Sequence, residues 1–182
     1  QFLQEQNASL LKDQDMTVQE IKISGEYLMS RFMSYQKEPV VKRLEFIADD
    51  ILAILKAKRQ GEIKLPSRAE LMKRLKKRLR YDNPLALYKA FYEEKGEGEL
   101  FVMKKNCFEF ADVYPYLYCH AYFEGIDTFD LIQHLVIDEM QDYTPLQFAV
   151  IQQIFSCKKT ILGDFSQSLN PFAINGVNSF TT

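Results

Sequence analysis

The sequence predicts an α/β fold in which a long helical region precedes a short parallel sheet. In the first part of the chain, apolar residues recur every three or four positions, which is typical of amphipathic helices. From about Leu131 onward, short apolar runs typical of buried strands replace that spacing. We therefore expect a helical region over residues 1–108 and an α/β region over residues 109–182.

Three helices are expected in the helical region. The segment Glu38–Lys58 places its apolar residues on one helical face. A second helix should begin near Ser67, because Ser67 and Glu70 have the capping-box spacing, and its basic face extends to Arg80. Pro84 suits the first turn of a third helix. The first ~110 residues are therefore expected to be helical, with breaks between the helices.

A strand, a helix and a second strand are expected after residue 130. Leu135–Ile137 and Thr160–Leu162 are the short apolar runs that predict the strands. Between them, Thr144–Gln147 combines an N-cap threonine, a proline at the first helical position and a glutamine at the capping-box position. This order predicts a βαβ unit whose two strands are parallel.

Acidic and amide side chains follow both predicted strands. The first strand continues into Asp138-Glu139-Met140-Gln141-Asp142, and the second continues into Gly163-Asp164-Phe165-Ser166-Gln167. Ligands of open parallel sheets bind beyond the carboxyl ends of the strands. Neighbouring residues on a strand point to opposite sides, so Asp138 and Glu139 should have different roles. One of them can hold a Mg²⁺ shell while the other faces an attacking water.

The two segments HLVIDEMQD and ILGDFSQS resemble motifs II and III of superfamily-one nucleic-acid helicases of the UvrD/Rep kind. The Walker B element of that family reads DExQD, and its motif III reads GDxxQS. The resemblance implies part of a RecA-like domain 1A of the P-loop NTPase type, with ATP and Mg²⁺ as cofactors. It implies that Asp138 ligates Mg²⁺, that Glu139 is the catalytic base and that Gln167 senses the γ-phosphate.

The same resemblance implies that Gln141, Asp142 and Asp164 couple the nucleotide site to neighbouring motifs. A plainer reading of HLVIDEMQD by itself is an apolar strand followed by an exposed acidic turn that caps a helix.

The helical region looks more like that of HelD, the helicase-like ATPase that associates with bacterial RNA polymerase. The similarity lies in the segment Leu85–Tyr92 and in the long helical region ahead of motif II. It implies a large α-helical insertion that wedges into the polymerase clamp, in an enzyme that uses ATP to release stalled polymerase. An ordinary UvrD-type DNA helicase remains the alternative within the family.

One window of the chain is strongly basic. Residues 56–80 contain 11 basic and 2 acidic side chains, although the net charge of the whole chain is −2. A helix with this many basic side chains can bind a phosphate backbone or an acidic protein surface, or it can simply be exposed to solvent. If it binds nucleic acid, DNA is the expected one. The candidate partner-binding residues are Arg68, Lys73, Arg74, Lys76 and Lys77.

Other parts of the helicase pattern are missing from the sequence. No GxxxxGK[ST] segment occurs, so the P-loop that cradles phosphates is absent, and so are motifs IV to VI with their arginine finger. We therefore expect the chain to be a piece of a longer ATPase and to be inactive alone. The alternative is a non-catalytic arm that binds RNA polymerase or another protein and keeps relic ATPase motifs.

The remaining composition favours a cytoplasmic protein. The three cysteines are far apart and odd in number, which fits core thiols in a reducing compartment better than disulfides. No apolar run approaches the ~20 residues of a membrane span, so no membrane partner is expected.

Overall fold

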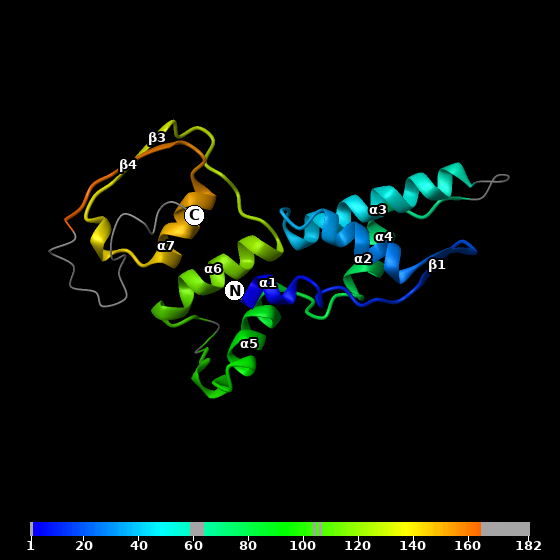
Figure 1. The fold of residues 1–182 in the computed structure, drawn as a ribbon, viewed down its shortest axis with the longest axis horizontal. Helices are drawn as coiled ribbons and strands as arrows, with labels where there is room; N and C mark the ends of the chain where they lie inside the picture. The colour runs from blue at the N-terminus through cyan, green and yellow to red at the C-terminus, as the bar shows by residue number, and fades with distance from the viewer. Residues whose placement is uncertain (1, 59–63, 104, 106, 165–182) are drawn as a thin grey trace. The chain divides into compact units, whose positions relative to one another are not determined.

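The chain folds into two compact units of mixed α/β structure. The computed structural model describes residues 2–58, 64–103, 105 and 107–164 (Figure 1). Unit 1 consists of Gln1–Val102 together with Tyr122–Gly125, and unit 2 consists of Met103–Ala121 and Ile126–Thr182. Each unit is described separately below.

Unit 1 is mainly helical. Its elements are α1 (Phe2–Gln6), β1 (Met16–Val18), β2 (Ile21–Ile23), α2 (Gly25–Ser34), α3 (Val40–Ala57), α4 (Arg68–Lys76), α5 (Pro84–Glu94) and the 3-10 turn η1 (Gly98–Leu100). Helix α3 packs against both α2 and α4 (Figure 1). The core consists of the apolar faces of these helices and of the strands, so burial of this surface stabilises the unit.

The three expected helices are present, with one different boundary. Leu44, Ile47 and Ile51 are fully buried along α3, as the apolar spacing predicted. The Ser67 hydroxyl caps α4 by accepting a hydrogen bond from the Glu70 amide at 3.1 Å. Helix α4 ends at Lys76, four residues before the expected end at Arg80. The chain leaves the helix there because residues around Leu79 form a bridge with the segment around Leu11.

The expectation of an all-helical first region was wrong. Strands β1 and β2 form an antiparallel hairpin in which Met16 pairs with Ile23 and Val18 pairs with Ile21. Val18 and Ile23 are buried in the core of unit 1. The hairpin therefore contributes apolar surface to the same core as the helices.

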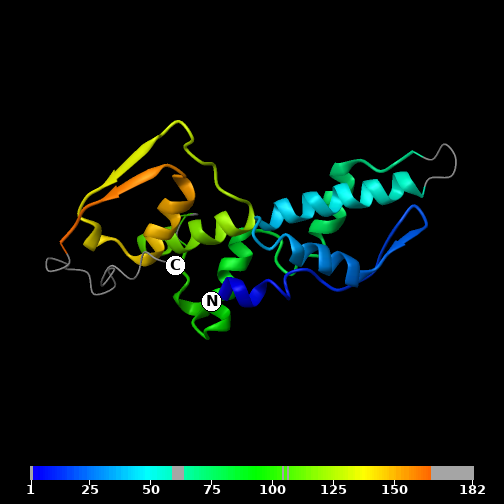
Figure 2. The same ribbon diagram turned by 45° about the horizontal axis from the view of Figure 1, so that its top comes forward.

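Unit 2 contains the predicted βαβ element. Helix α6 (Phe110–Phe123) extends through Ala121 within this unit, and β3 (His134–Ile137), the 3-10 turn η2 (Met140–Asp142), α7 (Pro145–Ile154) and β4 (Lys158–Ile161) follow. Strands β3 and β4 are parallel, with His134 opposite Lys158 and Ile137 opposite Ile161 (Figure 2). Strand β4 begins two residues earlier than expected, because its register follows β3 and not the apolar run alone.

The start of α7 has the predicted capping box. The Gln147 amide donates to the Thr144 hydroxyl at 3.2 Å, and the Thr144 amide donates to the Gln147 side chain at 2.7 Å. Phe148 and Ile137 pack together in a small core between α7 and the strands. The first turn of α7 is therefore capped and packed against the sheet.

Two of the three cysteines differ from the expected core thiols. Cys119 is buried, and burial raises the pKa of its thiol to about 12, whereas Cys107 is exposed and Cys157 is half-buried. Within the described part of the chain, no helix is both long enough and apolar enough to cross a membrane.

Candidate functional site

The acidic segment after β3 and the segment after β4 lie at the same edge of the sheet. The two strands are parallel and end in register at Ile137 and Ile161. The Leu162 amide donates to the Ile137 carbonyl at 2.8 Å, and the Met140 amide donates to the Leu162 carbonyl at 3.0 Å. The backbone after β3 therefore folds back onto the residues that follow β4.

Glu139 occupies a left-handed backbone conformation at this edge. Its φ is 52° and its ψ is 42°, a region that residues other than glycine, asparagine and aspartate seldom adopt. The Glu139 amide donates to the Asp138 carboxylate at 2.9 Å. Both carboxylates are exposed, so a ligand in solvent can reach them.

The Gln141 side chain links the two segments. It is 3% exposed, and its carbonyl oxygen accepts a hydrogen bond from the Asp164 amide at 3.0 Å. Its amide nitrogen donates to the Glu139 carboxylate at 2.5 Å. One buried side chain thus holds the Glu139 carboxylate and the Asp164 backbone in fixed positions, because breaking either bond would leave a buried polar group without that partner.

Gly163 is required by the close approach of these segments. A Cβ atom at this position would lie 2.4 Å from the Met140 side chain and 2.5 Å from the Gln141 carbonyl oxygen. Both distances are shorter than van der Waals contact, so only glycine fits without a shift. Gly163 was not predicted as a site residue, although a glycine directly after a strand is a signal of close backbone approach.

Of the two other predicted site residues, Asp142 and Gln167, the structure describes only Asp142, which is not part of this hydrogen-bonded group of side chains. Asp142 is exposed at the end of η2, and its amide donates to the Glu139 carbonyl at 3.0 Å. Gln167 lies outside the described residues. The structure therefore joins Glu139, Gln141 and Asp164 by direct hydrogen bonds and places Asp138 beside them.

The carboxylates of this edge suit a Mg²⁺ ion that is also held by a nucleotide. Among the residues that the structure describes, no three His, Cys, Asp or Glu side chains are grouped closely enough to hold a metal by themselves. Mg²⁺ in phosphoryl-transfer sites is usually bound by one or two carboxylates together with water and substrate phosphates. The exposed Asp138 fits that more limited role, since its hard oxygen ligands match the ion.

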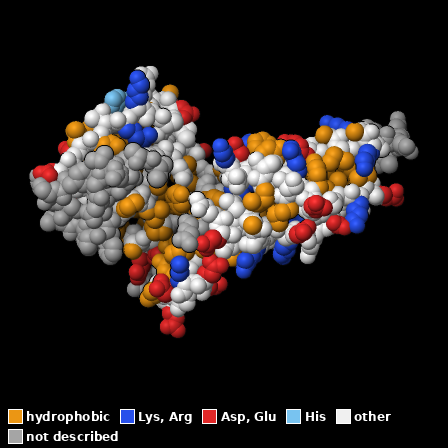
Figure 3. All heavy atoms as spheres, viewed as in Figure 1, with side chains coloured by type: hydrophobic (Ala, Val, Ile, Leu, Met, Phe, Trp, Pro, Cys, Tyr) orange, Lys and Arg blue, Asp and Glu red, His pale blue; other side chains and the backbone are white. Residues whose placement is uncertain are grey.

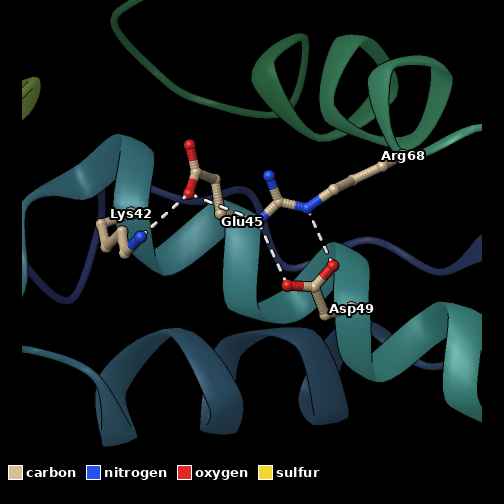
Figure 4. A network of polar contacts seen from close by, with 4 residues as sticks. All are labelled: Lys42, Glu45, Asp49 and Arg68. Atoms are coloured by element: carbon tan, nitrogen blue, oxygen red, sulfur yellow. Dashed lines mark hydrogen bonds and ion pairs between the residues drawn. The ribbon is translucent and has the colours of Figure 1, made fainter.

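The candidate basic residues of unit 1 fall into two groups. Arg68 forms a two-point ion pair with Asp49, with distances of 2.8 and 3.1 Å, and also contacts Glu45 at 3.3 Å (Figure 4). Its hydrogen bond to Asp49 holds the pKa of that carboxyl below its ordinary value. Arg74 donates to the Thr17 carbonyl at 2.5 Å. Both arginines therefore have their hydrogen-bond partners within unit 1.

The three lysines of the set face solvent instead. Lys73, Lys76 and Lys77 are exposed on α4 and just after it, and they border a hollow between α3 and α4. This hollow was not predicted, because the apolar residues on its floor come from two helices that are separated in the sequence.

Comparisons with known proteins add no family assignment. No family model matches the chain, and no curated protein sequence is significantly similar to it.

Proposed function

We propose that this chain is part of a UvrD/HelD-type ATPase and carries its Walker B element and motif III within a RecA-like domain. The observation that carries the proposal is the buried Gln141 side chain, which bonds Glu139 on one side and the Asp164 backbone on the other. A glutamine that only capped an exposed acidic turn would have no reason to reach the next strand. This link therefore favours a ligand site over a simple helix cap.

The exposed face of the sheet supports a larger parent domain. Val136 is 62% exposed on the face of β3 that points away from α7. Parallel sheets are normally covered on both faces, and their strands are accordingly apolar. An uncovered valine on a parallel pair is expected where further strands and helices complete the domain, as in a RecA-like sheet.

In this proposal the two carboxylates divide the chemistry. Asp138 would hold Mg²⁺, which when bound offsets negative charge on the β- and γ-phosphates of ATP. Glu139 would orient the attacking water and accept its proton. Gln141 would fix the Glu139 carboxylate through its 2.5 Å hydrogen bond, so that the base keeps one orientation during turnover.

Several groups of a complete ATPase must come from elsewhere in the longer protein. A P-loop would cradle the phosphates, and an arginine finger would stabilise the transition-state charge. Neither sequence pattern occurs in this chain. The chain by itself is therefore proposed to be inactive.

The proposed work of the ATPase is remodelling of nucleic acid or of RNA polymerase complexes in the cytoplasm. In this proposal unit 1 is the α-helical insertion, and its exposed lysines make the partner contact. The alternative is a binding arm with relic ATPase motifs. An intact P-loop in the longer protein favours the enzyme, and a degenerate one favours the binding arm.

The experiment compares two substitutions in the longer protein. Glu139→Gln keeps the size of the side chain but removes the base, so ATP turnover should fall by a factor on the order of 100 while nucleotide affinity survives. Asp138→Asn weakens metal coordination, so it should reduce both Mg²⁺-dependent affinity and turnover. Steady-state ATP hydrolysis and nucleotide affinity are measured for both variants.

Asp130→Asn is the matched control, because Asp130 is an exposed carboxylate of the same unit away from the strand ends. It should leave hydrolysis and affinity unchanged. Near-normal turnover in the Glu139→Gln protein would refute the enzyme and leave the acidic turn as a helix cap.

A further inference from the structure

A hollow of about 580 Å³ lies between helices α3 and α4 of unit 1. Its volume is within the usual range for small-ligand pockets. Ala69, Met72, Lys73 and Lys76 line it from one face of α4, and Val41 lines it from α3. The apolar members form a floor, and the lysines stand beside that floor.

The lysine charges at the hollow are not used inside the protein. Among the described residues, no ion pair of 4.0 Å or less involves Lys73, Lys76 or Lys77. Of the two acidic lining residues, Glu45 is paired with both Lys42 and Arg68 at 3.3 Å (Figure 4), whereas none of the ion pairs among the described residues includes Asp82. The hollow therefore offers three unpaired lysine charges to a partner, against one unpaired carboxylate of its own.

Three arginines of the basic window are bound to the protein itself. Arg68 pairs with Asp49, Arg74 donates to the Thr17 carbonyl, and Arg78 donates to the Asp15 carbonyl at 2.6 Å. Arginine is the side chain best suited to grip phosphate with two parallel hydrogen bonds. No arginine is among the residues that line the hollow, so a phosphate backbone bound there would meet only the ammonium groups of Lys73, Lys76 and Lys77.

The floor of the hollow also disfavours a phosphate backbone. Val41 and Met72 are half-buried, and they pack against the core while still lining the hollow. A phosphate backbone would leave this apolar surface uncovered, whereas an aliphatic or aromatic side chain would remove it from water. Methionine adapts its shape to different apolar partners, which suits a docking pocket. In Figure 3 apolar patches lie among separate Lys and Arg side chains on the visible face of unit 1, without a continuous basic band.

We propose that the hollow between α3 and α4 binds an acidic protein segment that inserts an apolar side chain. The apolar anchor covers Val41 and Met72, and carboxylates on either side of it pair with Lys73 and Lys76. These lysines are three residues apart on α4, so they match carboxylates one turn apart on a helical partner. The proposed function assigns a partner contact to the exposed lysines of unit 1, and this inference names the kind of partner they bind. It depends only on residues of unit 1.

The test uses the full chain without nucleotide and a labelled synthetic peptide. The peptide has about 16 residues, enough for a stable amphipathic helix, with Asp and Glu flanking two leucines one turn apart. Fluorescence anisotropy should show binding that weakens at least about tenfold with the double change Lys73→Glu and Lys76→Glu, because both rim charges then repel the peptide. Lys37→Glu with Lys95→Glu is the matched control, since both are exposed lysines of unit 1 outside the hollow, and it should have little effect.

A second pair of measurements examines the apolar floor. A peptide with serine in place of both leucines should bind at least about tenfold more weakly, because its anchor is lost. Ala69→Gln should weaken the leucine peptide as well, since it fills the hollow from an exposed helical position without adding charge. Circular dichroism confirms that each variant remains folded.

Three results would overturn the proposal. Equal affinity for the serine and leucine peptides would mean that the floor plays no part. A single-stranded oligonucleotide of equal charge that binds more tightly than the peptide, with a steep salt dependence that the lysine changes flatten, would assign the surface to nucleic acid. No binding of the leucine peptide would exclude an acidic segment. ATP hydrolysis is measured separately, so failure here leaves the ATPase proposal standing.

Discussion

Arg43 is a fully buried cation held by neutral oxygen acceptors. Its guanidinium group donates to the Glu38 carbonyl at 2.6 Å, to the Asn7 side chain at 2.7 Å and to the Gln36 carbonyl at 2.8 Å. Burial lowers the pKa of Arg43, because the charged form loses its hydration. The three hydrogen bonds offset that loss, and they connect α3 to the turn before it and to the segment after α1.

Replacing Arg43 with lysine should destabilise unit 1 although the charge is kept. A single ammonium group cannot reach three acceptors that surround a planar fork, so at least one buried acceptor loses its partner. The free energy of unfolding should fall by about 1–3 kcal/mol, the usual range for a buried polar group left unpaired. Urea denaturation followed by circular dichroism measures this change.

Arg80→Lys is the control, because Arg80 is exposed and lies over the Tyr81 ring at 5.4 Å. It should change the stability by less than about 0.5 kcal/mol. Equal stability of the Arg43→Lys protein and the parent chain would show that the buried hydrogen bonds of Arg43 contribute little.

The residues after β3 and β4 differ in how far the sequence alone predicts their roles. Asp138 and Glu139 could be chosen from the sequence as candidate site residues, because ligands of open parallel sheets bind beyond the carboxyl ends of the strands. The burial of Gln141 could not be predicted, because it depends on how closely two separate loops approach. The spacing of apolar residues also does not reveal Arg43, because a charged residue is not expected at a buried position of α3.

At the scale of elements, the β1–β2 hairpin has an unfavourable turn sequence. Gln19 and Glu20 form its two-residue connection with φ values of 49° and 66°. Two-residue turns with positive φ at both positions strongly prefer asparagine and glycine. Glu20 therefore adopts a backbone conformation that costs about 1 kcal/mol relative to glycine.

Glu20→Gly should stabilise unit 1 because it removes this backbone cost. Part of the gain is offset by the greater freedom of glycine in the unfolded chain, so the net increase in the free energy of unfolding should be about 0.5–1 kcal/mol. Urea denaturation measures it. Gln19 is left unchanged, because its side chain donates to the Lys64 carbonyl.

The same change in a helix should have the opposite sign. Glu93→Gly lies in the last turn of α5 on an exposed position, where glycine should cost about 1 kcal/mol. A loss of stability in both variants would show that the positive φ of Glu20 carries no measurable strain.

The elements that the sequence predicted are those with long or capped patterns. Helix α3 repeats its apolar spacing over several turns, and α7 begins with a capping box that forms in the structure. The β1–β2 hairpin escaped prediction because each strand has three residues and its turn lacks the Asn-Gly signal. The early end of α4 depends on the pairing of Leu79 with Leu11, which no local pattern indicates.

At the scale of the whole molecule, the two units present different candidate binding surfaces. Unit 2 presents exposed carboxylates at the edge of a parallel pair, and unit 1 presents lysines around an apolar hollow. The two-stranded pair supplies the metal-side and base groups of the proposed ATPase, but a nucleotide is held chiefly by backbone amides around its phosphates. The proposed activity therefore requires a phosphate cradle that this chain does not encode.

Because the carboxylates lie in this chain and the phosphate cradle does not, the isolated chain should bind Mg-ATP weakly. With Asp138 and Glu139 as its main contacts, the dissociation constant should exceed about 1 mM, which corresponds to a binding free energy weaker than about −4 kcal/mol. Isothermal titration calorimetry of the folded chain with Mg-ATP measures this constant. The longer protein, if it carries an intact P-loop, is the matched control and should bind far more tightly. Micromolar binding by the chain alone would contradict the prediction, because the phosphates would then have to be held by residues of this chain in place of a P-loop.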